Sequence, residues 1–381
     1  MTSRLPIRGF TIVLALALAG CGGDDPPAAE PLPTPSGSCG PGLAEAGTPD
    51  GDGLSAPDIA TEVTAAVETE PVPNDGDAAD DAAIWVNPVE PARSVVIGTD
   101  KRGGIGVYDL DGREWQYRRD GRMNNVDLRC DHPIAGEPAT IVTAGNRSNN
   151  TIAVYRFDGA LRRLFDVAAQ PIHPDLDIYG SCMYRDGDSG RLYVFVTSQE
   201  GQVEQWELAA TPQGRIAGEQ VRTFALGSTV EGCVVDDTTG ELYVAEEKVG
   251  IWKFAADPAG DLDQVLIART EPRGELVADL EGLALLRFSP SAGYLLVSTQ
   301  GDDSVAVLDL QEPHQHRGRF SIVDGAAVDG ADNTDGIALA WADLGPPFSR
   351  GVFVAHDGEN DDGNQNYKLV PLDSIFSALG R

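Results

Sequence analysis

The sequence predicts an all-β fold, a six-bladed β-propeller with four-stranded antiparallel blades. The first observation is that 44 glycines and 25 prolines divide the 381 residues into short segments, which fits strands and turns better than long helices. The second is a repeated β-hairpin, in which an apolar strand and a polar turn lead into another strand. The third is a further strand ahead of each hairpin, with a fourth expected after it. A β-sandwich would not repeat in phase, and a TIM barrel would show helical periods.

The six repeats follow one another along the printed sequence. The hairpins occupy residues 94–112, 139–159, 191–208, 241–254, 294–310 and 351–373. Each preceding strand begins beside a polar residue, and these residues are Asp80 and Asp81, Asn124 and Asn125, Tyr179, Glu231, Glu281 and Asp335. The polar residues recur in step with the hairpins, so they mark one structural position in every blade.

The N-terminal part of the chain indicates export and lipid attachment. Residues 1–21 have a basic start and a short apolar run, and they end at Cys21 in a Leu-Ala-Gly-Cys sequence that resembles a bacterial lipobox. An ordinary cleaved signal peptide is the alternative. Residues 22–60 are rich in Pro, Gly and Asp and are expected to form a flexible tether, with the propeller at 61–381. We therefore expect an extracytoplasmic monomer, lipid-anchored to the cell envelope (Gly22 favours the outer membrane) or secreted.

The charge of the chain excludes some classes of partner. Its formal net charge of −32, from 60 acidic and 28 basic residues, argues against binding to nucleic acid or to an anionic membrane surface. Two interpretations remain open. The acidic residues can serve solubility, or they can gather to hold hard cations such as calcium.

Cysteines and histidines give weaker signals. Cys39, Cys130, Cys182 and Cys233 could pair in an oxidising compartment, and their spacing gives no zinc pattern. Cys182 and Cys233 lie in apolar strand-like runs, where buried free thiols are expected. The histidines form no metal set by spacing, and surface positions are expected for most of His132, His173, His314, His316 and His356.

A site is expected where the inner strands of a propeller begin, because these positions converge on the central axis. The polar residues listed above would meet there, and the hairpin turns would return to the same end of the channel. Carboxylates gathered in this way repel one another unless cations or shifted pKa values relieve them. Oxygen ligands without His or thiolate select hard cations, and calcium best fits a flexible site with many ligands.

Three basic residues are expected among these acids: Lys101, Arg102 and Arg147. Ion pairs within the protein are one interpretation. Contact with phosphate is the other interpretation, because arginine can donate two hydrogen bonds to phosphate oxygens and lysine supplies a point charge.

Long motifs in this region resemble the β-propeller phytases. They include DAADDAAIWVNP at 77–88, GTDKRGGIGVYDLDG at 98–112, GRMNNVDLR at 121–129 and VAHDGENDDGNQNYKLVP at 354–371, and the resemblance spans about residues 63–375. The resemblance implies a calcium-dependent enzyme that cleaves phosphate monoesters of phytate, releasing inorganic phosphate and lower inositol phosphates. It implies two neighbouring phosphate sites and direct attack by a water that several calcium ions activate.

The resemblance also implies roles for single residues. Catalytic roles at the calcium cluster fall to Asp81, Tyr179, Glu231, Glu281 and Asp335. Substrate contacts fall to Lys101, Arg102, Arg147, Gln199 and Glu200. Calcium ligands would be Asp80, Asp81, Asn124, Asn125, Val126, Tyr179, Glu231, Glu247, Glu281, Asp335, Asp357, Glu359 and Asn360.

The chain departs from the family pattern at two positions. Gln199 stands where the family usually has a lysine, so one positive charge is missing from the adjacent phosphate site. Ala82 replaces the proline usual after the paired aspartates, which should affect only backbone stiffness.

Two other functions are compatible with the same pattern. A non-catalytic calcium-binding propeller would present a surface to a partner, and a metal-dependent propeller lactonase would use channel carboxylates without phosphate-binding cations. Arg147 separates these classes, because its loss should cripple a phytase and spare a lactonase.

Overall fold

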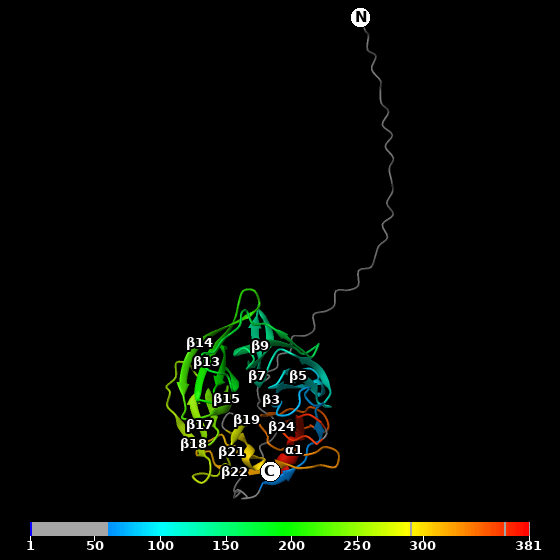
Figure 1. Ribbon diagram of the computed structural model, residues 1–381, viewed down its shortest axis with the longest axis vertical. Coiled ribbons are helices and arrows are strands. Elements are labelled where there is room, and N and C mark those ends of the chain that lie inside the picture. Colours follow the sequence, from blue (N-terminus) through cyan, green and yellow to red (C-terminus); the bar gives the residue numbers. More distant parts are fainter. Residues whose placement is uncertain (2–59, 290–291, 362, 381) are drawn as a thin grey trace. The chain divides into compact units, whose positions relative to one another are not determined.

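A computed structural model describes Met1 and residues 60–289, 292–361 and 363–380 of the chain. Apart from Met1 and residue 60, the expected signal peptide, the expected lipidation residue Cys21, the expected tether and Cys39 lie outside the described residues. From residue 60 onward, the chain forms six sheets arranged in a ring around a central channel (Figure 1). The predicted six-bladed β-propeller is confirmed.

Each of the first four blades uses four consecutive antiparallel strands. Blade 1 consists of β3 (Ala79–Trp85), β4 (Val95–Asp100), β5 (Gly104–Asp109) and β6 (Glu114–Arg118), and blade 2 of β7 (Met123–Ile134), β8 (Glu137–Asn146), β9 (Thr151–Asp158) and β10 (Arg163–Asp166). Blade 3 consists of β11 (Ser181–Arg185), β12 (Leu192–Thr197), β13 (Gln202–Ala210) and β14 (Ile216–Ala225), and blade 4 of β15 (Val230–Asp236), β16 (Glu241–Glu246), β17 (Gly250–Ala255) and β18 (Val265–Arg269).

The last two blades recruit strands from the start of the domain. Blade 5 consists of β19 (Leu280–Ser289), β20 (Ala292–Thr299), β21 (Ser304–Asp309) and β22 (His316–Ile322), with β1 (Thr61–Val63) added in parallel to β22. Blade 6 consists of β23 (Ile337–Ala340), β24 (Val352–Asp357), β25 (Asn366–Pro371) and β2 (Val67–Glu68).

The sixth blade corrects one expectation. The sequence predicts a fourth strand after every hairpin, but a short helix, α1 (Leu372–Ala378), follows the sixth hairpin instead. Its fourth strand is β2, which pairs antiparallel to β25 with Val67 opposite Leu369 and Glu68 opposite Lys368. Because β2 has only two residues, it shows no periodicity that could predict its place.

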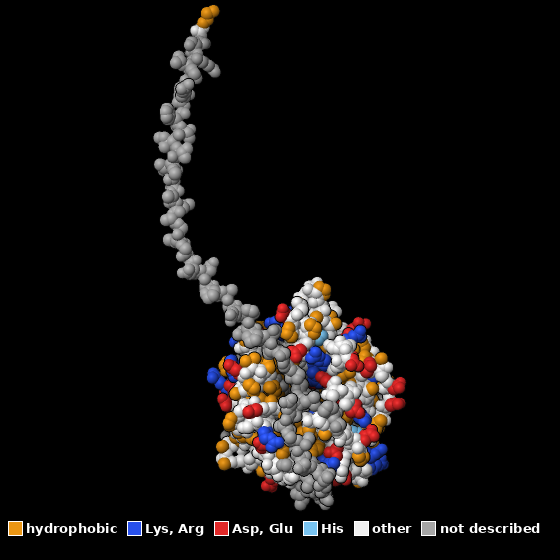
Figure 2. Space-filling view, turned by 180° about the vertical axis from the view of Figure 1, so that it is seen from behind, with side chains coloured by type: hydrophobic (Ala, Val, Ile, Leu, Met, Phe, Trp, Pro, Cys, Tyr) orange, Lys and Arg blue, Asp and Glu red, His pale blue; other side chains and the backbone are white. Residues whose placement is uncertain are grey.

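The core lies between the blades. Among the described residues, each of six hydrophobic clusters joins two neighbouring sheets: Tyr155 and Ile97 belong to the cluster between blades 1 and 2, for example, and Phe320 and Phe353 to the one between blades 5 and 6. Full burial of such a side chain stabilises the fold by about 1.5–3 kcal/mol. The outer surface carries both acidic and basic side chains between apolar ones (Figure 2). The ring is thus held by packing between blades, which fixes where the inner strands begin.

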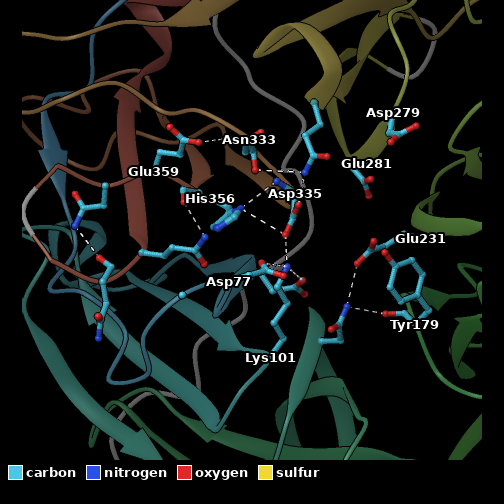
Figure 3. Close-up of a pocket in the computed structure, with 18 of the residues that line it drawn as sticks. Asp77, Lys101, Tyr179, Glu231, Asp279, Glu281, Asn333, Asp335, His356 and Glu359 are labelled. Carbon is cyan, nitrogen blue, oxygen red and sulfur yellow. Dashed lines mark hydrogen bonds and ion pairs between the residues drawn. The ribbon is translucent and has the colours of Figure 1, made fainter.

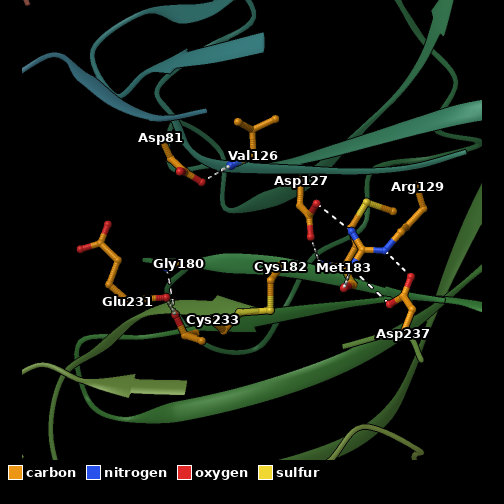
Figure 4. The surroundings of a disulfide bond; sticks show 11 residues. Asp81, Val126, Asp127, Arg129, Gly180, Cys182, Met183, Glu231, Cys233 and Asp237 are labelled. Atoms are coloured by element: carbon orange, nitrogen blue, oxygen red, sulfur yellow. Dashed lines mark hydrogen bonds and ion pairs between the residues drawn. A yellow bond between two sulfur atoms is a disulfide. The ribbon is translucent and has the colours of Figure 1, made fainter. Parts of the chain in front are cut away.

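A disulfide joins two inner strands and corrects the expectation of free thiols. Cys182 of β11 and Cys233 of β15 are bonded, with Cα atoms 5.6 Å apart (Figure 4). Their strands are neighbours in the ring, so residues 51 apart in sequence meet there. Cys130 is also disulfide-bonded. The strand pattern correctly indicates burial of Cys182 and Cys233, but their pairing depends on the ring.

The histidines differ from expectation as well. His132, His314, His316 and His356 are buried, and only His173 of the five is exposed. The buried four lie in or just before β7, β22 and β24, and burial lowers the pKa of each imidazole, which favours its neutral form. Within the described part of the chain, no helix has the length and apolar character needed to cross a membrane.

Candidate active site

A cavity of about 770 Å³ opens at one end of the central channel, and we call it the main cavity. Every blade contributes one polar residue to it at, or just before, the start of its inner strand. These residues are Asp80, Asn124, Tyr179, Glu231, Glu281 and Asp335. The turn after the second strand of each blade contributes another residue to the lining: Lys101, Arg147, Gln199, Glu247, Gln300 and Glu359. Figure 3 labels six of these side chains around the cavity: Lys101, Tyr179, Glu231, Glu281, Asp335 and Glu359.

Irregular pairing at the start of the inner strands aims these side chains. The register shifts between Ala79 and Ala82 in β3 and between Asn124 and Val126 in β7, where Asn125 has a φ of 46°. A bulge of this kind re-aims a side chain and bends its strand. As a result Asp80 lines the main cavity, whereas the adjacent Asp81 lines a separate pocket further along the channel.

Three glutamates form the acidic centre of the main cavity. Carboxylate oxygens of Glu231, Glu247 and Glu281 all lie within 4.8 Å of one another. Glu231 and Glu281 are 6% and 5% exposed, so water screens their charges poorly. Burial, and then repulsion from neighbouring carboxylates, raises the pKa of Glu231 and of Glu281 well above the usual value, and burial raises the pKa of Glu247.

The same glutamates fit a hard divalent cation. Glu281 Oε2 is buried and has no hydrogen-bond donor among the described residues, which leaves an acceptor that a cation can satisfy. The donors are all oxygens, and hard cations such as calcium prefer such a set. A bound cation would also remove the repulsion that raises the two pKa values.

A tyrosine and an arginine border this centre. The guanidinium of Arg147 lies over the Tyr179 ring, 5.4 Å from the ring centroid, and donates to Asn124 Oδ1 at 3.1 Å. Burial, together with the charges of Glu231 and Glu281, raises the pKa of the Tyr179 phenol. Tyr179 is therefore a neutral phenol at ordinary pH unless a cation binds beside it.

Lys101 holds the opposite wall together. Its Nζ atom lies 2.5 Å from Asp335 Oδ2, 2.7 Å from Asp77 Oδ1 and 3.6 Å from Asp80 Oδ1. Although burial acts in the opposite direction, these carboxylates raise the pKa of Lys101, so the ammonium stays charged. Burial raises the pKa of Asp80 and Asp335, while Lys101 opposes that effect. This wall thus offers a permanent cation to an anionic ligand.

His356 holds the backbone of Asp335 in place through a hydrogen bond. Its Nδ1 accepts the backbone N–H of Asp335 at 3.0 Å, and its side chain is only 1% exposed. Burial, with a smaller contribution from Lys101, lowers the pKa of His356 to about 4. The imidazole is therefore neutral at physiological pH and acts as an acceptor rather than a charge.

A smaller pocket of about 250 Å³ adjoins the main cavity, and we call it the side pocket. Arg147, Tyr179 and Gln199 line both of them, while Arg122 and Glu200 line the side pocket alone. An anionic ligand with two charged groups could therefore reach from one into the other past Arg147.

The remaining expected site residues lie elsewhere. Asp81, Asn125 and Val126 line a pocket of about 230 Å³ further along the channel, which we call the far pocket. Asp81 accepts the backbone N–H of Val126 at 3.0 Å, and burial raises its pKa well above the usual value. The Arg102 side chain is 52% exposed and its Nη1 donates to the Asp75 carbonyl at 2.7 Å, and Arg102 does not line the main cavity.

The acidic turn after β24 is linked to a buried lysine. Lys368 Nζ lies 3.1 Å from Asp357 Oδ2 and 2.6 Å from Glu68 Oε2, and it also contacts Asp329. Its fourth partner is the amide oxygen Oδ1 of Asn360, at 3.2 Å. Glu359 and Asn360 line the main cavity, while Asp357 lies buried beneath. An ammonium therefore already balances part of this group, and a calcium ion at this turn stays a prediction.

Sequence reasoning missed several residues of the main cavity. They are Asp77, Asp279, Asn333, His356, Asn364 and Gln365, together with Arg122 in the side pocket. Asp77 and Asp279 precede the polar positions of their blades by two or three residues, which is the one signal that could have found them. His356 is the penultimate residue of the apolar strand β24, so the sequence alone gives no reason to place it beside Asp335.

The fold and this cavity define a class of protein: a β-propeller that sets clustered carboxylates against basic residues around its axis. The family model described as Phytase matches residues 53–381, and the chain belongs to this family. It is 42% identical over 328 residues to the 3-phytase of Bacillus subtilis (strain 168), an alignment that covers 84% of this chain and 85% of that protein.

A solved structure shares the fold at low identity. It is the calcium-binding protein regucalcin from Agrobacterium tumefaciens strain C58, with a TM-score of 0.51 and 12% identity, and the match covers 82% of this chain and 97% of that one. At this identity the likeness concerns the fold alone.

Proposed function

We propose that this chain is a calcium-dependent 3-phytase, which hydrolyses phosphate monoesters of phytate to inorganic phosphate and lower inositol phosphates. The observation that carries the proposal is the division of the main cavity, in which buried glutamates face Lys101 and Arg147. Membership of the phytase family and the similarity to the Bacillus 3-phytase support this activity.

Calcium is the cofactor that the ligand set favours, and we propose that several ions bind. Glu231, Glu247 and Glu281 would hold one part of the cluster, and Asp80 and Asp335 another. Calcium bound there would neutralise charge on a phosphate group and lower the pKa of a bound water that serves as the attacking nucleophile.

The side chains around the cluster bind and orient the substrate. Lys101 offers its ammonium to a phosphate oxygen, which requires it to exchange part of its contact with Asp335. Arg147, held by Asn124 and the Tyr179 ring, presents its guanidinium where the main cavity meets the side pocket. Such cations favour the transition state because phosphoryl transfer is driven by positioning and charge stabilisation.

We propose that the side pocket holds a second phosphate group of the same substrate. Arg122 and Arg147 supply positive charge there, while Glu200 and Asp177 oppose it. Gln199 adds no charge at the boundary of the two cavities. Affinity for a substrate with two adjacent phosphates should therefore be lower than with a lysine at this position.

The test is phosphate release from phytate by the full chain, first with calcium and then with excess chelator. Calcium-dependent release supports the proposal. If a folded protein releases no phosphate with calcium, the phytase proposal fails. In that case hydrolysis of a lactone, with Arg147→Ala as active as the unchanged chain, would support a lactonase, and calcium binding without hydrolysis would support a binding propeller.

We further propose that the enzyme is a monomer held at the cell envelope by lipid on Cys21. The Leu-Ala-Gly-Cys sequence and the Pro- and Gly-rich stretch after it support this proposal. Incorporation of labelled palmitate into the chain, and its loss in Cys21→Ala, would test the anchor. A single species of monomer mass in light scattering would test the oligomeric state.

A further inference from the structure

Asn124 lies at the meeting point of three blades in the wall of the main cavity. It belongs to β7 of blade 2 and is 0% exposed. Its Nδ2 donates to the Tyr179 carbonyl at 2.7 Å and to Glu231 Oε1 at 2.9 Å, reaching blades 3 and 4. Its Oδ1 accepts from Arg147 at 3.1 Å. One amide thus contacts both the acidic centre and the basic residue beside it.

The orientation of this amide is fixed by its partners. The Tyr179 carbonyl can only accept a hydrogen bond, and the Arg147 guanidinium can only donate one. The amide nitrogen must therefore face Tyr179 and Glu231, and the amide oxygen must face Arg147. Aspartate at position 124 would lose the donor, and an aliphatic residue would lose both functions.

The arrangement keeps two opposite charges apart. Arg147 and Glu231 both contact the same small side chain, so they are close enough that removal of the amide would let them approach each other. Glu231 is already buried, so much of its desolvation cost is met before the pair forms, and the poorly screened attraction would then favour a direct ion pair with Arg147. Such a pair would take Glu231 away from a cation and Arg147 away from a phosphate.

We infer that Asn124 is a positioning residue that insulates Glu231 from Arg147, so that the carboxylate stays available to calcium and the guanidinium to phosphate. This inference rests on the proposed function. It gives Asn124 a role different from that of a calcium ligand, because its Nδ2 is a donor and its Oδ1 is already bonded to Arg147.

A double-mutant cycle on the full chain tests the inference. Calcium affinity is measured by calorimetry on metal-free protein, and KM and kcat are measured with phytate, for Asn124→Ala, Arg147→Ala and the double variant. Asn124→Ala should weaken calcium binding and raise KM, each about tenfold, the size expected for one charge-assisted contact. Arg147→Ala alone should leave calcium affinity unchanged. In the double variant calcium affinity should return to that of Arg147→Ala, because no guanidinium remains to capture Glu231.

A buried amide away from the cavity provides the control. Gln205 is 0% exposed, and its Nε2 donates to the Ala256 carbonyl of the next blade at 2.8 Å. Gln205→Leu should lower stability without changing calcium affinity or KM. If the double variant binds calcium as weakly as Asn124→Ala, or if Asn124→Ala binds it normally, the inference is wrong.

A second variant keeps the test open if Asn124→Ala does not fold. Asn124→Asp has the same shape, and Arg147 should pair with the new carboxylate. KM should then rise about tenfold while calcium affinity does not fall. An unchanged KM in folded Asn124→Asp would contradict the inference. If the unchanged chain releases no phosphate at all, the proposed function fails, and the calorimetric cycle still decides the role of Asn124.

Discussion

The main cavity and the far pocket lie along one channel, but they differ in how their buried charged side chains are balanced. Arg129 lines the far pocket, where its guanidinium lies 2.8 Å from Asp127 Oδ1 and 2.7 Å from Asp237 Oδ2, and its side chain is 8% exposed. In the main cavity, Glu231 and Glu281 are as deeply buried, and burial raises their pKa values while the charges of neighbouring carboxylates raise them further.

The difference indicates what each region is for. The charge of Arg129 in the far pocket is balanced by two carboxylates of the protein itself, so this group serves the fold. Charges in the main cavity are in excess and need something from outside the protein, so they serve binding. The same six inner strands run through both regions. One end of each strand therefore lies in the structural region, and the other end lies at the binding site.

The largest effect is expected from neutralising the acidic centre. Glu231→Gln should lower phosphate release by about 10³-fold, because a group that stabilises charge in the reaction is lost. In chelator the same variant should be at least as stable as the unchanged chain, since buried repulsion is relieved. Phosphate assays and thermal unfolding measure the two effects. A loss of stability in chelator, together with normal activity, would break the comparison.

The opposite result is expected in the far pocket. Arg129→Ala leaves Asp127 and Asp237 without their buried partner and should lower stability by about 3–5 kcal/mol. The kcat of the protein that remains folded should stay unchanged. Urea unfolding and active-site-normalised kinetics provide the measurement, and a selective fall in kcat would contradict the assignment of a structural role.

A pH series separates His356 from the acids around it. Its folded pKa of about 4 lies below the usual 6.5, so burial of the neutral ring favours the fold fully above pH 6.5, and that contribution is lost as the pH falls towards 4. The difference corresponds to about 3 kcal/mol at about 1.4 kcal/mol per pH unit.

When the pH falls from 6.5 to 4, the free energy of unfolding of the unchanged chain should therefore drop by about 3 kcal/mol more than that of His356→Gln. Glutamine can still accept the Asp335 N–H, which keeps the local contact. The exposed His173→Gln serves as the control and should follow the unchanged chain. Parallel unfolding curves for His356→Gln and the unchanged chain over this range would contradict the low pKa.

The smallest effect is expected at the boundary of the main cavity and the side pocket. Gln199→Lys adds a cation beside Arg147 and should lower KM for phytate about threefold to tenfold, with little change in kcat. A simple phosphate monoester, which cannot reach into the side pocket, should show no such gain. An equal gain for both substrates would mean that the lysine acts in the main cavity alone.

Much of this architecture could be predicted from the sequence because propeller repeats are local. Hairpins such as 94–112 and 139–159 are indicated by the alternation of apolar and polar residues and by their turn residues. The polar residue before each inner strand recurs in phase with them. The rest depends on distances that only the closed ring creates. The pairing of Cys182 with Cys233 is of this kind. The different pockets of Asp80 and Asp81 follow instead from the local register shift between Ala79 and Ala82, which the sequence pattern does not indicate.

The two-residue strand β2 has a consequence for the order in which the domain can be completed. Its backbone pairs with β25, and Lys368 bonds Glu68 across 300 residues of chain. Among the described residues, β25 is the strand with which β2 pairs, so during synthesis β2 must stay unpaired until β25 has been made. The ring therefore cannot close progressively, and closure over so long a loop should be among the slow steps of folding. A chain cut before residue 366 would lack β25, so β2 would lose its partner strand and β24 would form an open edge of the sixth blade. The strand β25 is therefore needed to close the whole ring.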